Sequence, residues 1–317
     1  MEFAGVVYTS RLPAAIEEEL ETRFGARHVG PADADFCARL TRTWGLVAGP
    51  GASLDSALIH RLPGSVRIIA SYSVGVDHID IEAARIRGIV VTNTPDVVTN
   101  ATADVAMLLI LSACRQASWA ERRLRAGEWR GASLLDTFGV DLAGRTLGIF
   151  GYGRIGQATA RRGVAFGMQI VYHGRHPRAV TDLPGARFEA QLHAFLAASD
   201  IVSLHVPLTP ATRHVVDRDA IAAMRPGSIL VNTARGGLVD DEALIEALRS
   251  GHLRAAGLDV YDSEPRIRPG YLTLDNVTLL PHIGTATIET RLAMGRAVIA
   301  NLKAFREGRE PPGWVRT

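Results

Sequence analysis

Short apolar runs alternate with longer amphipathic stretches from the start of the chain. In its first part the apolar runs occupy residues 6–8, 45–48, 66–70 and 88–91. The stretch 13–24 predicts a helix, because Pro13 suits a helix start and acidic side chains fill the first turns. Short apolar runs separated by helices are typical of a parallel sheet that is covered on both faces.

A second alternating series follows residues 101–125, which we interpret as one long helix. Its apolar runs occupy residues 145–150, 169–172, 201–204, 228–231, 255–258 and 277–280. Strands separated by helices in this way fit a doubly wound dinucleotide-binding domain. A last predicted helix, 286–306, is expected to return to the first part of the chain. We therefore predict an α/β protein with two domains, a discontinuous one formed by residues 1–98 and 287–317, and a dinucleotide-binding one formed by residues 99–286.

Composition narrows the class of protein. The 317 residues exceed what one hydrophobic core usually organises. Lys and Arg number 35 against 33 Asp and Glu, and this balance indicates neither a nucleic-acid nor a membrane partner. The apolar stretch 105–113 is too short to cross a bilayer, which takes about 20 residues. Only Cys37 and Cys114 are present, without metal-ligand spacing, so we expect a reduced, cytoplasmic chain and no metal site.

A glycine-rich segment begins the second series. Residues 151–156 match G-x-G-x-x-G, directly after the predicted strand and before the predicted helix 157–166. In that context the backbone N–H groups and the helix dipole can bind a pyrophosphate, whereas the same pattern elsewhere is only a turn. We therefore predict dinucleotide binding by Gly151, Gly153 and Gly156.

The end of the next predicted strand bears on which dinucleotide binds. An NAD site would place Asp or Glu there, on the ribose 2′-hydroxyl, but residues 173–178 contain no carboxylate. They contain Arg175 and Arg178, whose planar guanidinium groups suit a 2′-phosphate. The alternative is a solvated turn that happens to be basic. We predict that NADPH is preferred and that NADH remains usable.

Three charged residues follow three consecutive strands of the second series. Arg235, Glu264 and His282 can converge, because the carboxyl ends of the strands in an open sheet border the ligand crevice. A guanidinium binds a carboxylate and polarises a neighbouring carbonyl, and a histidine supplies a proton near neutral pH. A carboxylate beside that histidine stabilises its charged form. Each could alone be a loop salt bridge, a solvated turn or a loop histidine, but their shared placement favours reduction of a 2-keto acid.

These segments, with residues 73–80 and 93–97, carry a resemblance that spans nearly the whole chain. The sequence resembles the D-2-hydroxyacid dehydrogenase family and, within it, the glyoxylate/hydroxypyruvate reductases. The resemblance implies two Rossmann-like domains, the substrate domain being flavodoxin-like. It also implies that Arg235 binds the substrate, that Glu264 is the carboxylate of the dyad and that His282 is the general acid.

Further site residues are implied by the same resemblance. The N–H groups of Val74 and Gly75 would hold the substrate carboxylate from the other domain, and Thr285 would also contact the substrate. The implied cofactor-binding residues are Gly151, Gly153, Arg154, Ile155, Gly156, Gly174, Arg175, His205, Val206, Pro207, Thr212, Thr233, Ala234, Arg235, Asp259, His282 and Gly284. We expect His78 to cap or pack locally and His205 to pack against the cofactor.

The expected activity is NADPH-dependent reduction of glyoxylate and hydroxypyruvate to D-2-hydroxy acids. One alternative is a bulkier acid, such as 2-ketogluconate or a branched or phenylpyruvate-type acid. Another, of a different class, is a dinucleotide-sensing binding protein like the related corepressors. Formate oxidation would leave the Glu264–His282 pair idle. The resemblance also implies a homodimer, formed through the cofactor domain and the loop 127–139, in which no tryptophan follows Trp129.

Overall fold

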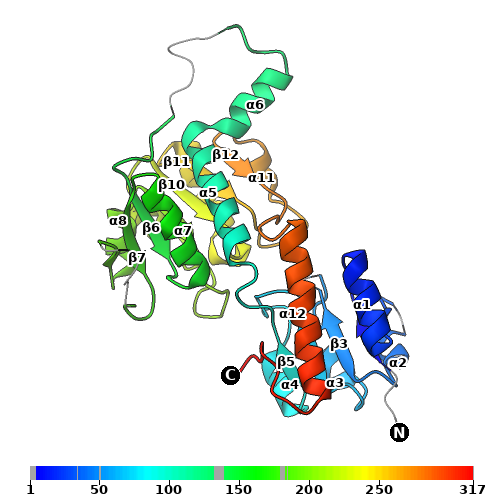
Figure 1. Ribbon diagram of the computed structural model, residues 1–317. Coiled ribbons are helices and arrows are strands. Elements are labelled where there is room, and N and C mark those ends of the chain that lie inside the picture. The colour runs from blue at the N-terminus through cyan, green and yellow to red at the C-terminus, as the bar shows by residue number, and fades with distance from the viewer. Residues whose placement is uncertain are drawn as a thin grey trace. The chain divides into compact units, whose positions relative to one another are not determined.

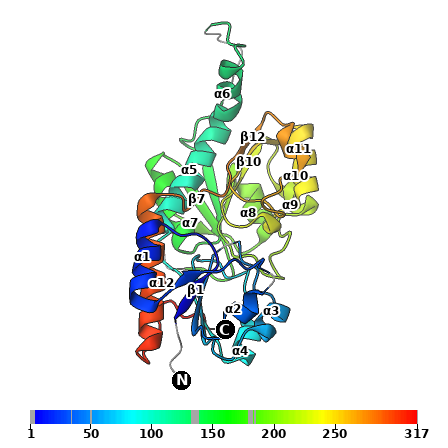
Figure 2. The same ribbon diagram turned by 90° about the vertical axis from the view of Figure 1, so that its right-hand side faces the viewer.

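The computed structural model describes residues 5–33, 35–49, 51–131, 139–178, 183 and 185–316. The chain folds into two compact units (Figures 1 and 2). The first comprises Met1–Val98 and Ala286–Thr317, and the second comprises Thr99–Thr285. Each unit contains one parallel sheet, and the predicted α/β class with two Rossmann-like domains is confirmed.

The first unit has a five-stranded sheet in the order β2-β1-β3-β4-β5, which is the flavodoxin-like order. Its strands are β1 (Val6–Tyr8), β2 (Arg27–His28), β3 (Gly45–Ala48), β4 (Ile68–Ser71) and β5 (Val90–Thr92). Its helices are α1 (Ala14–Phe24), α2 (Phe36–Arg39), α3 (Ser56–Arg61), α4 (Ile81–Ile86) and α12 (Ile288–Arg306). The sequence did not predict β2, because its two polar residues carry no apolar periodicity.

Helix α12 explains why the first unit is discontinuous. Ile16, Leu20 and Phe24 lie four residues apart on α1 and are all buried. Gly295 of α12 faces Ile16, and a Cβ at that glycine would collide with the Ile16 side chain. The two helices therefore pack closely, and α12 belongs to the first unit.

The second unit has a seven-stranded sheet in the order β12-β11-β10-β9-β6-β7-β8, the doubly wound arrangement with an added strand. The strands are β6 (Thr146–Phe150), β7 (Gln169–His173), β8 (Arg187–Phe188), β9 (Ile201–Leu204), β10 (Ser228–Asn232), β11 (Leu253–Leu258) and β12 (Val277–Leu279). The helices are α5 (Thr99–Arg115), α6 (Ala117–Arg125), α7 (Arg154–Ala165), α8 (Leu192–Ala198), α9 (Arg218–Ala223), α10 (Asp241–Ser250) and α11 (Pro269–Leu272). The short edge strand β8 was not predicted.

Two apolar cores cover the faces of this sheet. Ile170 and Tyr172 of β7 belong to the core beneath α5, whereas Val171 between them belongs to the core beneath α8, α9 and α10. Alternate residues of a strand point to opposite faces, so a strand that is covered on both faces must be apolar throughout. This packing accounts for the continuous apolar runs in the sequence.

The prediction of one helix over residues 101–125 was wrong. Helix α5 ends at Arg115, and Gln116 adopts a left-handed conformation with φ 51° before α6 begins. The chain turns there, and α6 extends away from the body of its unit (Figures 1 and 2). No residue of α6 is buried. Residues 132–138 of the predicted dimer loop lie outside the described residues.

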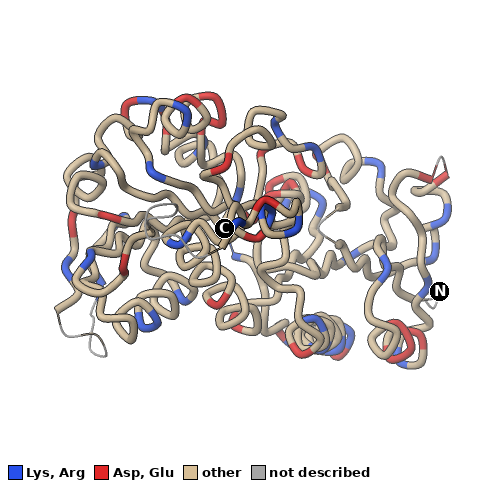
Figure 3. Tube along the Cα trace, turned by 90° about the horizontal axis from the view of Figure 1, so that it is seen from above, with Lys and Arg blue, Asp and Glu red and all other residues tan. Residues whose placement is uncertain are grey.

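Acidic and basic residues are interspersed along both units (Figure 3). Among the described residues, no helix combines the length and the apolar character needed to span a bilayer. The described residues likewise contain no group of three or more His, Cys, Asp or Glu side chains placed to hold a metal ion.

Candidate active site

The predicted site residues of the second unit lie at one edge of its sheet. Each of six strands, β6, β7, β9, β10, β11 and β12, is followed at its carboxyl end by a segment that carries predicted site residues. All of these strands are parallel, so the six segments meet at the same edge of the sheet.

His282 and Glu264 form a direct pair at this edge. The Nδ1 atom of His282 lies 2.7 Å from Oε2 of Glu264, and the two side chains are 42% and 35% exposed. The other carboxylate oxygen of Glu264 accepts the backbone N–H of Tyr261 at 2.9 Å. Burial raises the pKa of Glu264, but these two hydrogen bonds and the charges of His282 and Arg235 outweigh burial and lower it. Glu264 is therefore ionised at neutral pH and accepts a hydrogen bond from the N–H at Nδ1 of His282.

The backbone of the His282 segment is held in an unusual conformation. His282 has φ 54°, in the left-handed region that costs a residue with a side chain about 1 to 3 kcal/mol. Asp259, which is 1% exposed, accepts the N–H groups of Ile283 and Gly284 at 2.7 and 2.8 Å. Tyr261 donates its hydroxyl to the Leu280 carbonyl at 2.9 Å. Residues on both sides of His282 are thus anchored to the segment after β11.

Asp259 has a structural contact beside the cofactor contact that the family resemblance implies. Each of its carboxylate oxygens accepts one backbone N–H group. Burial raises the pKa of Asp259, and the two N–H donors oppose that effect. Through these two hydrogen bonds the Asp259 side chain fixes the backbone of the loop that carries His282.

Arg235 belongs to the same cluster. Its positive charge is close enough to lower the pKa of Glu264, and its Nη1 atom donates to the Ala234 carbonyl at 2.7 Å. Asn232 at the end of β10 shapes this turn, because its side chain donates to the Arg235 carbonyl at 2.8 Å and accepts the Ala234 N–H at 3.0 Å. Sequence reasoning missed Asn232, although its position as the last residue of a strand was a signal.

Gly236 allows the Arg235 and Glu264 segments to approach each other. A Cβ at Gly236 would overlap the backbone of Tyr261 and Asp262. Only glycine therefore fits where the turn after β10 crosses the segment after β11. This close packing brings residues far apart in the sequence to one place.

The glycine-rich segment fits a dinucleotide phosphate group. Gly151 has φ 99°, which favours glycine. A Cβ at Gly156 would overlap the Gly151 carbonyl, whereas the Cβ position of Gly153 meets nothing within 4 Å, so open space adjoins the N-terminus of α7. Gly153, the N-cap residue of α7, has no side chain that could cap the helix. Backbone N–H groups beside open space can receive a phosphate.

Arg154 and Ile155 open α7, and Gly174 and Arg175 follow β7. Arg175 is exposed, so its guanidinium is accessible to a phosphate group of a bound ligand.

Thr233, after β10, has a second feature of a ligand site: its hydroxyl is buried and has no hydrogen-bond partner among the described residues. A buried hydroxyl usually has a partner, so a cofactor hydroxyl fits this position.

The loop after β9 contacts the glycine-rich segment. A Cβ at Gly151 would lie 2.7 Å from the His205 backbone and from the Val206 side chain. Thr212 donates its hydroxyl to the Pro207 carbonyl at 2.8 Å and so closes the loop. Burial lowers the pKa of His205 to about 3, so this imidazole is neutral near pH 7, and its Nε2 atom lies 2.9 Å from the Ser203 hydroxyl.

In the first unit, the loop after β4 presents backbone N–H groups. Three carbonyls of this loop are occupied. The Ser73 carbonyl accepts the N–H of Thr94 at 3.0 Å, and the Val74 carbonyl accepts the side-chain amide of Asn93 at 2.8 Å. The Gly75 carbonyl accepts the Ser73 hydroxyl. Within the described part of the chain, no atom accepts a hydrogen bond from the N–H of Val74 or Gly75. These two donors are available to an anion.

Two predicted residues have less defined surroundings. Thr285 is half-buried at the end of the second unit. His78 has its Nε2 atom 3.4 Å from the Ser71 hydroxyl, a local contact. Gly284, by contrast, is held firmly, because its carbonyl also accepts the Thr102 hydroxyl at 3.3 Å.

Comparison with known proteins identifies the family. The profile of the D-isomer specific 2-hydroxyacid dehydrogenase, NAD binding domain, matches residues 107–284. Glyoxylate reductase of Thermococcus litoralis is 46% identical over 268 residues, which cover 83% of this chain and 80% of the relative.

Two solved structures are similar over almost their whole length. The glyoxylate reductase from Paecilomyes thermophila has a TM-score of 0.91 at 37% identity, covering 99% of both chains. The NADPH-dependent glyoxylate/hydroxypyruvate reductase from Sinorhizobium meliloti, in complex with NADP and malonate, has a TM-score of 0.90 at 37% identity, covering 98% of this chain and 96% of that one. The resemblance seen in the sequence is confirmed: the chain belongs to the D-isomer specific 2-hydroxyacid dehydrogenase family and is an NAD(P)-dependent oxidoreductase.

Proposed function

We propose that this protein reduces small 2-keto acids, with glyoxylate and hydroxypyruvate preferred, to D-2-hydroxy acids with NADPH. The observation that carries the proposal is the 2.7 Å contact between His282 Nδ1 and Glu264 at the edge of a dinucleotide-binding sheet. The names of the similar glyoxylate reductases support the same substrate class.

His282 is the proton donor in this proposal. An ionised carboxylate can only accept, so the hydrogen on Nδ1 is committed to Glu264 and Nε2 faces the substrate oxygen. Bound NADPH supplies the hydride to the carbonyl carbon. The carbonyl oxygen then takes the Nε2 proton, and the products are the hydroxy acid, NADP⁺ and a neutral imidazole that regains a proton from solvent.

Three groups orient the substrate. The Arg235 guanidinium binds the carboxylate and polarises the carbonyl. The N–H groups of Val74 and Gly75 bind the same carboxylate, and Thr285 lines the site. Two observations support that role: the neighbouring carbonyls are occupied by hydrogen bonds, and these two N–H groups have no acceptor among the described residues.

The dyad can be tested by replacing each of its members. Glu264 holds the Nδ1 side of the imidazole at 2.7 Å and so leaves Nε2 for the substrate oxygen. We expect Glu264→Gln to lower kcat for glyoxylate about tenfold or more, and His282→Gln to lose most of the activity. A Glu264→Gln enzyme with the kcat of the wild type would contradict the pairing.

The NADPH preference is assigned to Arg175. Its guanidinium is exposed at the end of β7, where an NAD enzyme carries a carboxylate. We expect Arg175→Asp to lower kcat/KM for NADPH at least tenfold and to spare that for NADH. If the ratio between the two cofactors were unchanged, the basic turn would be a solvated surface only.

The substrate class is tested by steady-state rates over a panel of 2-keto acids with both cofactors. We expect glyoxylate and hydroxypyruvate to give higher kcat/KM values than 2-ketogluconate or phenylpyruvate. A reversed order would replace the proposed substrate by a bulkier acid. Tight NADPH binding with no turnover of any acid would favour the dinucleotide-sensing alternative.

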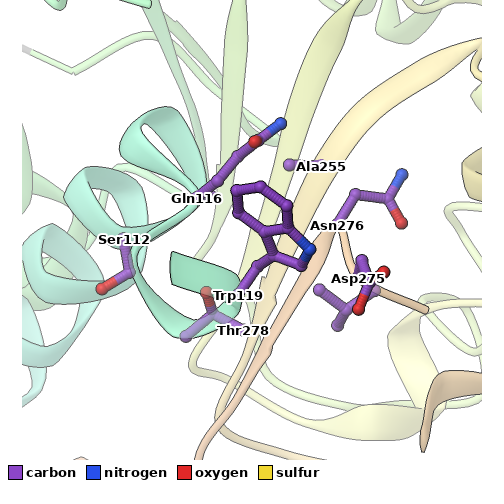
Figure 4. Close-up of a pocket in the computed structure, with 9 residues that line it drawn as sticks. Ser112, Gln116, Trp119, Ala255, Asp275, Asn276 and Thr278 are labelled. Atoms are coloured by element: carbon purple, nitrogen blue, oxygen red, sulfur yellow. The ribbon is translucent and has the colours of Figure 1, made fainter. Parts of the chain in front are cut away.

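We further propose a homodimer formed through the second unit and the loop 127–139, which follows α6. Helix α6 has no buried residue, and Leu124 and Trp129 are exposed. At its base, Trp119 lines a pocket together with Gln116, Asp275 and Asn276 (Figure 4). Sedimentation analysis should give twice the chain mass, and Leu124→Asp should shift it toward the monomer; a wild-type monomer at micromolar concentration would refute the dimer.

A further inference from the structure

We propose that Asn93 is a positioning residue that aims the N–H groups of Val74 and Gly75 at the substrate carboxylate. The inference rests on the proposed function for the identity of the anion, and on the geometry of the first unit for the mechanism. Neither composition nor the family resemblance assigned a role to Asn93.

The argument begins with the peptide planes of the loop after β4. In a trans peptide, the C=O and the N–H of the same unit point in opposite directions. The Val74 carbonyl and the Gly75 N–H share one such plane, and the Ser73 carbonyl and the Val74 N–H share the preceding one. Anchoring the two carbonyls therefore also sets the direction of the two N–H groups.

Both carbonyls are anchored by one dipeptide. Asn93 donates its side-chain amide to the Val74 carbonyl at 2.8 Å, and Thr94 donates its backbone N–H to the Ser73 carbonyl at 3.0 Å. Because a carbonyl only accepts, the atom of Asn93 that faces Val74 must be the amide nitrogen. The side chain of Asn93 is thus the part of this anchor that a substitution can remove.

Asn93 is itself held from the opposite end of the chain. Its carbonyl accepts the Asn301 side-chain amide of α12 at 3.0 Å, and its N–H donates to the Gly313 carbonyl at 2.9 Å. Asn301, which is buried, also accepts the Gly313 N–H at 2.8 Å. The backbone of Asn93 is therefore fixed on both sides, so its side chain meets Val74 with little loss of conformational entropy.

The orientation of these N–H groups should matter only for substrates that carry a carboxylate. The two N–H groups bind a carboxylate and contribute no binding energy to a substrate that lacks one. The ratio of kcat/KM for glyoxylate to kcat/KM for glyoxal, an aldehyde of similar size without a carboxylate, measures this contribution. The ratio is taken within one preparation, so a partly unfolded sample does not change it.

The test is Asn93→Ala in the full chain, with Thr92→Val as the matched control. Thr92 lies in the same segment, and its buried hydroxyl has no partner in the described part of the structure. We expect Asn93→Ala to lower the glyoxylate-to-glyoxal ratio about 10- to 100-fold, mainly through KM for glyoxylate. Thr92→Val should leave the ratio within twofold of wild type. Asn93→Asp, which keeps the shape but has no donor, should lower the ratio as well.

The outcomes separate this inference from the proposed function. An unchanged ratio in Asn93→Ala, or equal losses with both aldehydes, would overturn the inference while leaving the activity established. If the wild type reduces no 2-keto acid, the proposed function fails, and calorimetric binding of oxalate decides the inference. Oxalate affinity that falls at least tenfold in Asn93→Ala supports it, and equal affinity refutes it.

Discussion

The buried carboxylate of Asp259 offers the sharpest test of how the site is built. It accepts two backbone N–H groups, those of Ile283 at 2.7 Å and Gly284 at 2.8 Å, and thereby holds the loop of His282. Replacing it with alanine leaves both donors without that acceptor. Asparagine keeps one acceptor oxygen but turns its own amide toward the other N–H.

The expected magnitudes follow from these contacts. A buried donor left unpaired costs about 1 to 3 kcal/mol, and water can reach the half-buried Ile283 N–H more easily than the buried Gly284 N–H. Removing a carboxylate whose pKa is raised by burial returns part of that cost. We expect Asp259→Ala to lower the free energy of unfolding by roughly 2 to 4 kcal/mol and Asp259→Asn by about half as much.

The measurement is urea unfolding followed by circular dichroism, together with kcat/KM for glyoxylate. The control is Asp262→Asn, which removes a partly exposed ion pair with Arg213 at 3.3 Å and should change stability by less than about 1 kcal/mol. Activity should fall at least tenfold in both Asp259 variants, because the loop no longer holds His282. An Asp259→Ala protein as stable as the control variant would refute the reasoning.

The pH dependence of this contribution also has a definite sign. Because the pKa of Asp259 is raised in the folded protein, the folded state binds its proton more tightly than the unfolded state does. The stability that this protonation contributes is present below the unfolded pKa of about 4 and is lost as pH rises through the folded value. The free energy of unfolding of the wild type should therefore fall relative to Asp259→Asn over that interval.

Three further predictions concern neighbouring positions. Burial lowers the pKa of His205 to about 3 in the folded protein, whereas an unfolded histidine has a pKa of about 6.5. Lowering the pH from about 6.5 toward about 3 should therefore lower the melting temperature of the wild type relative to that of His205→Gln. Gly236→Ala should lower the melting temperature and kcat/KM together, because its Cβ overlaps the Tyr261 backbone; unchanged values would contradict the packing. Gly156→Ala should weaken NADPH binding about tenfold or more by fluorescence titration, because its Cβ overlaps the Gly151 carbonyl; equal affinity would contradict phosphate binding by the glycine-rich segment.

The sequence by itself determined the order of strands and helices and the identity of the chemical groups. Both are local properties: a strand covered on two faces must be apolar throughout, and G-x-G-x-x-G between a strand and a helix has one common use. It predicted the two sheets, and it placed Arg235, Glu264 and His282 after consecutive strands. The short polar strands β2 and β8 carry no such local signal, and the break at Gln116 interrupts an otherwise continuous helical pattern.

Only the tertiary structure decided which atoms meet. The 2.7 Å contact of His282 with Glu264 depends on a left-handed backbone at His282, which Asp259 and Tyr261 hold from the segment after β11. The contact of Asn93 with the Val74 carbonyl likewise depends on the pairing of β4 with β5. Hydrogen bonds between residues distant in sequence leave no periodicity along the chain, so their partners emerge only when the strands are placed side by side.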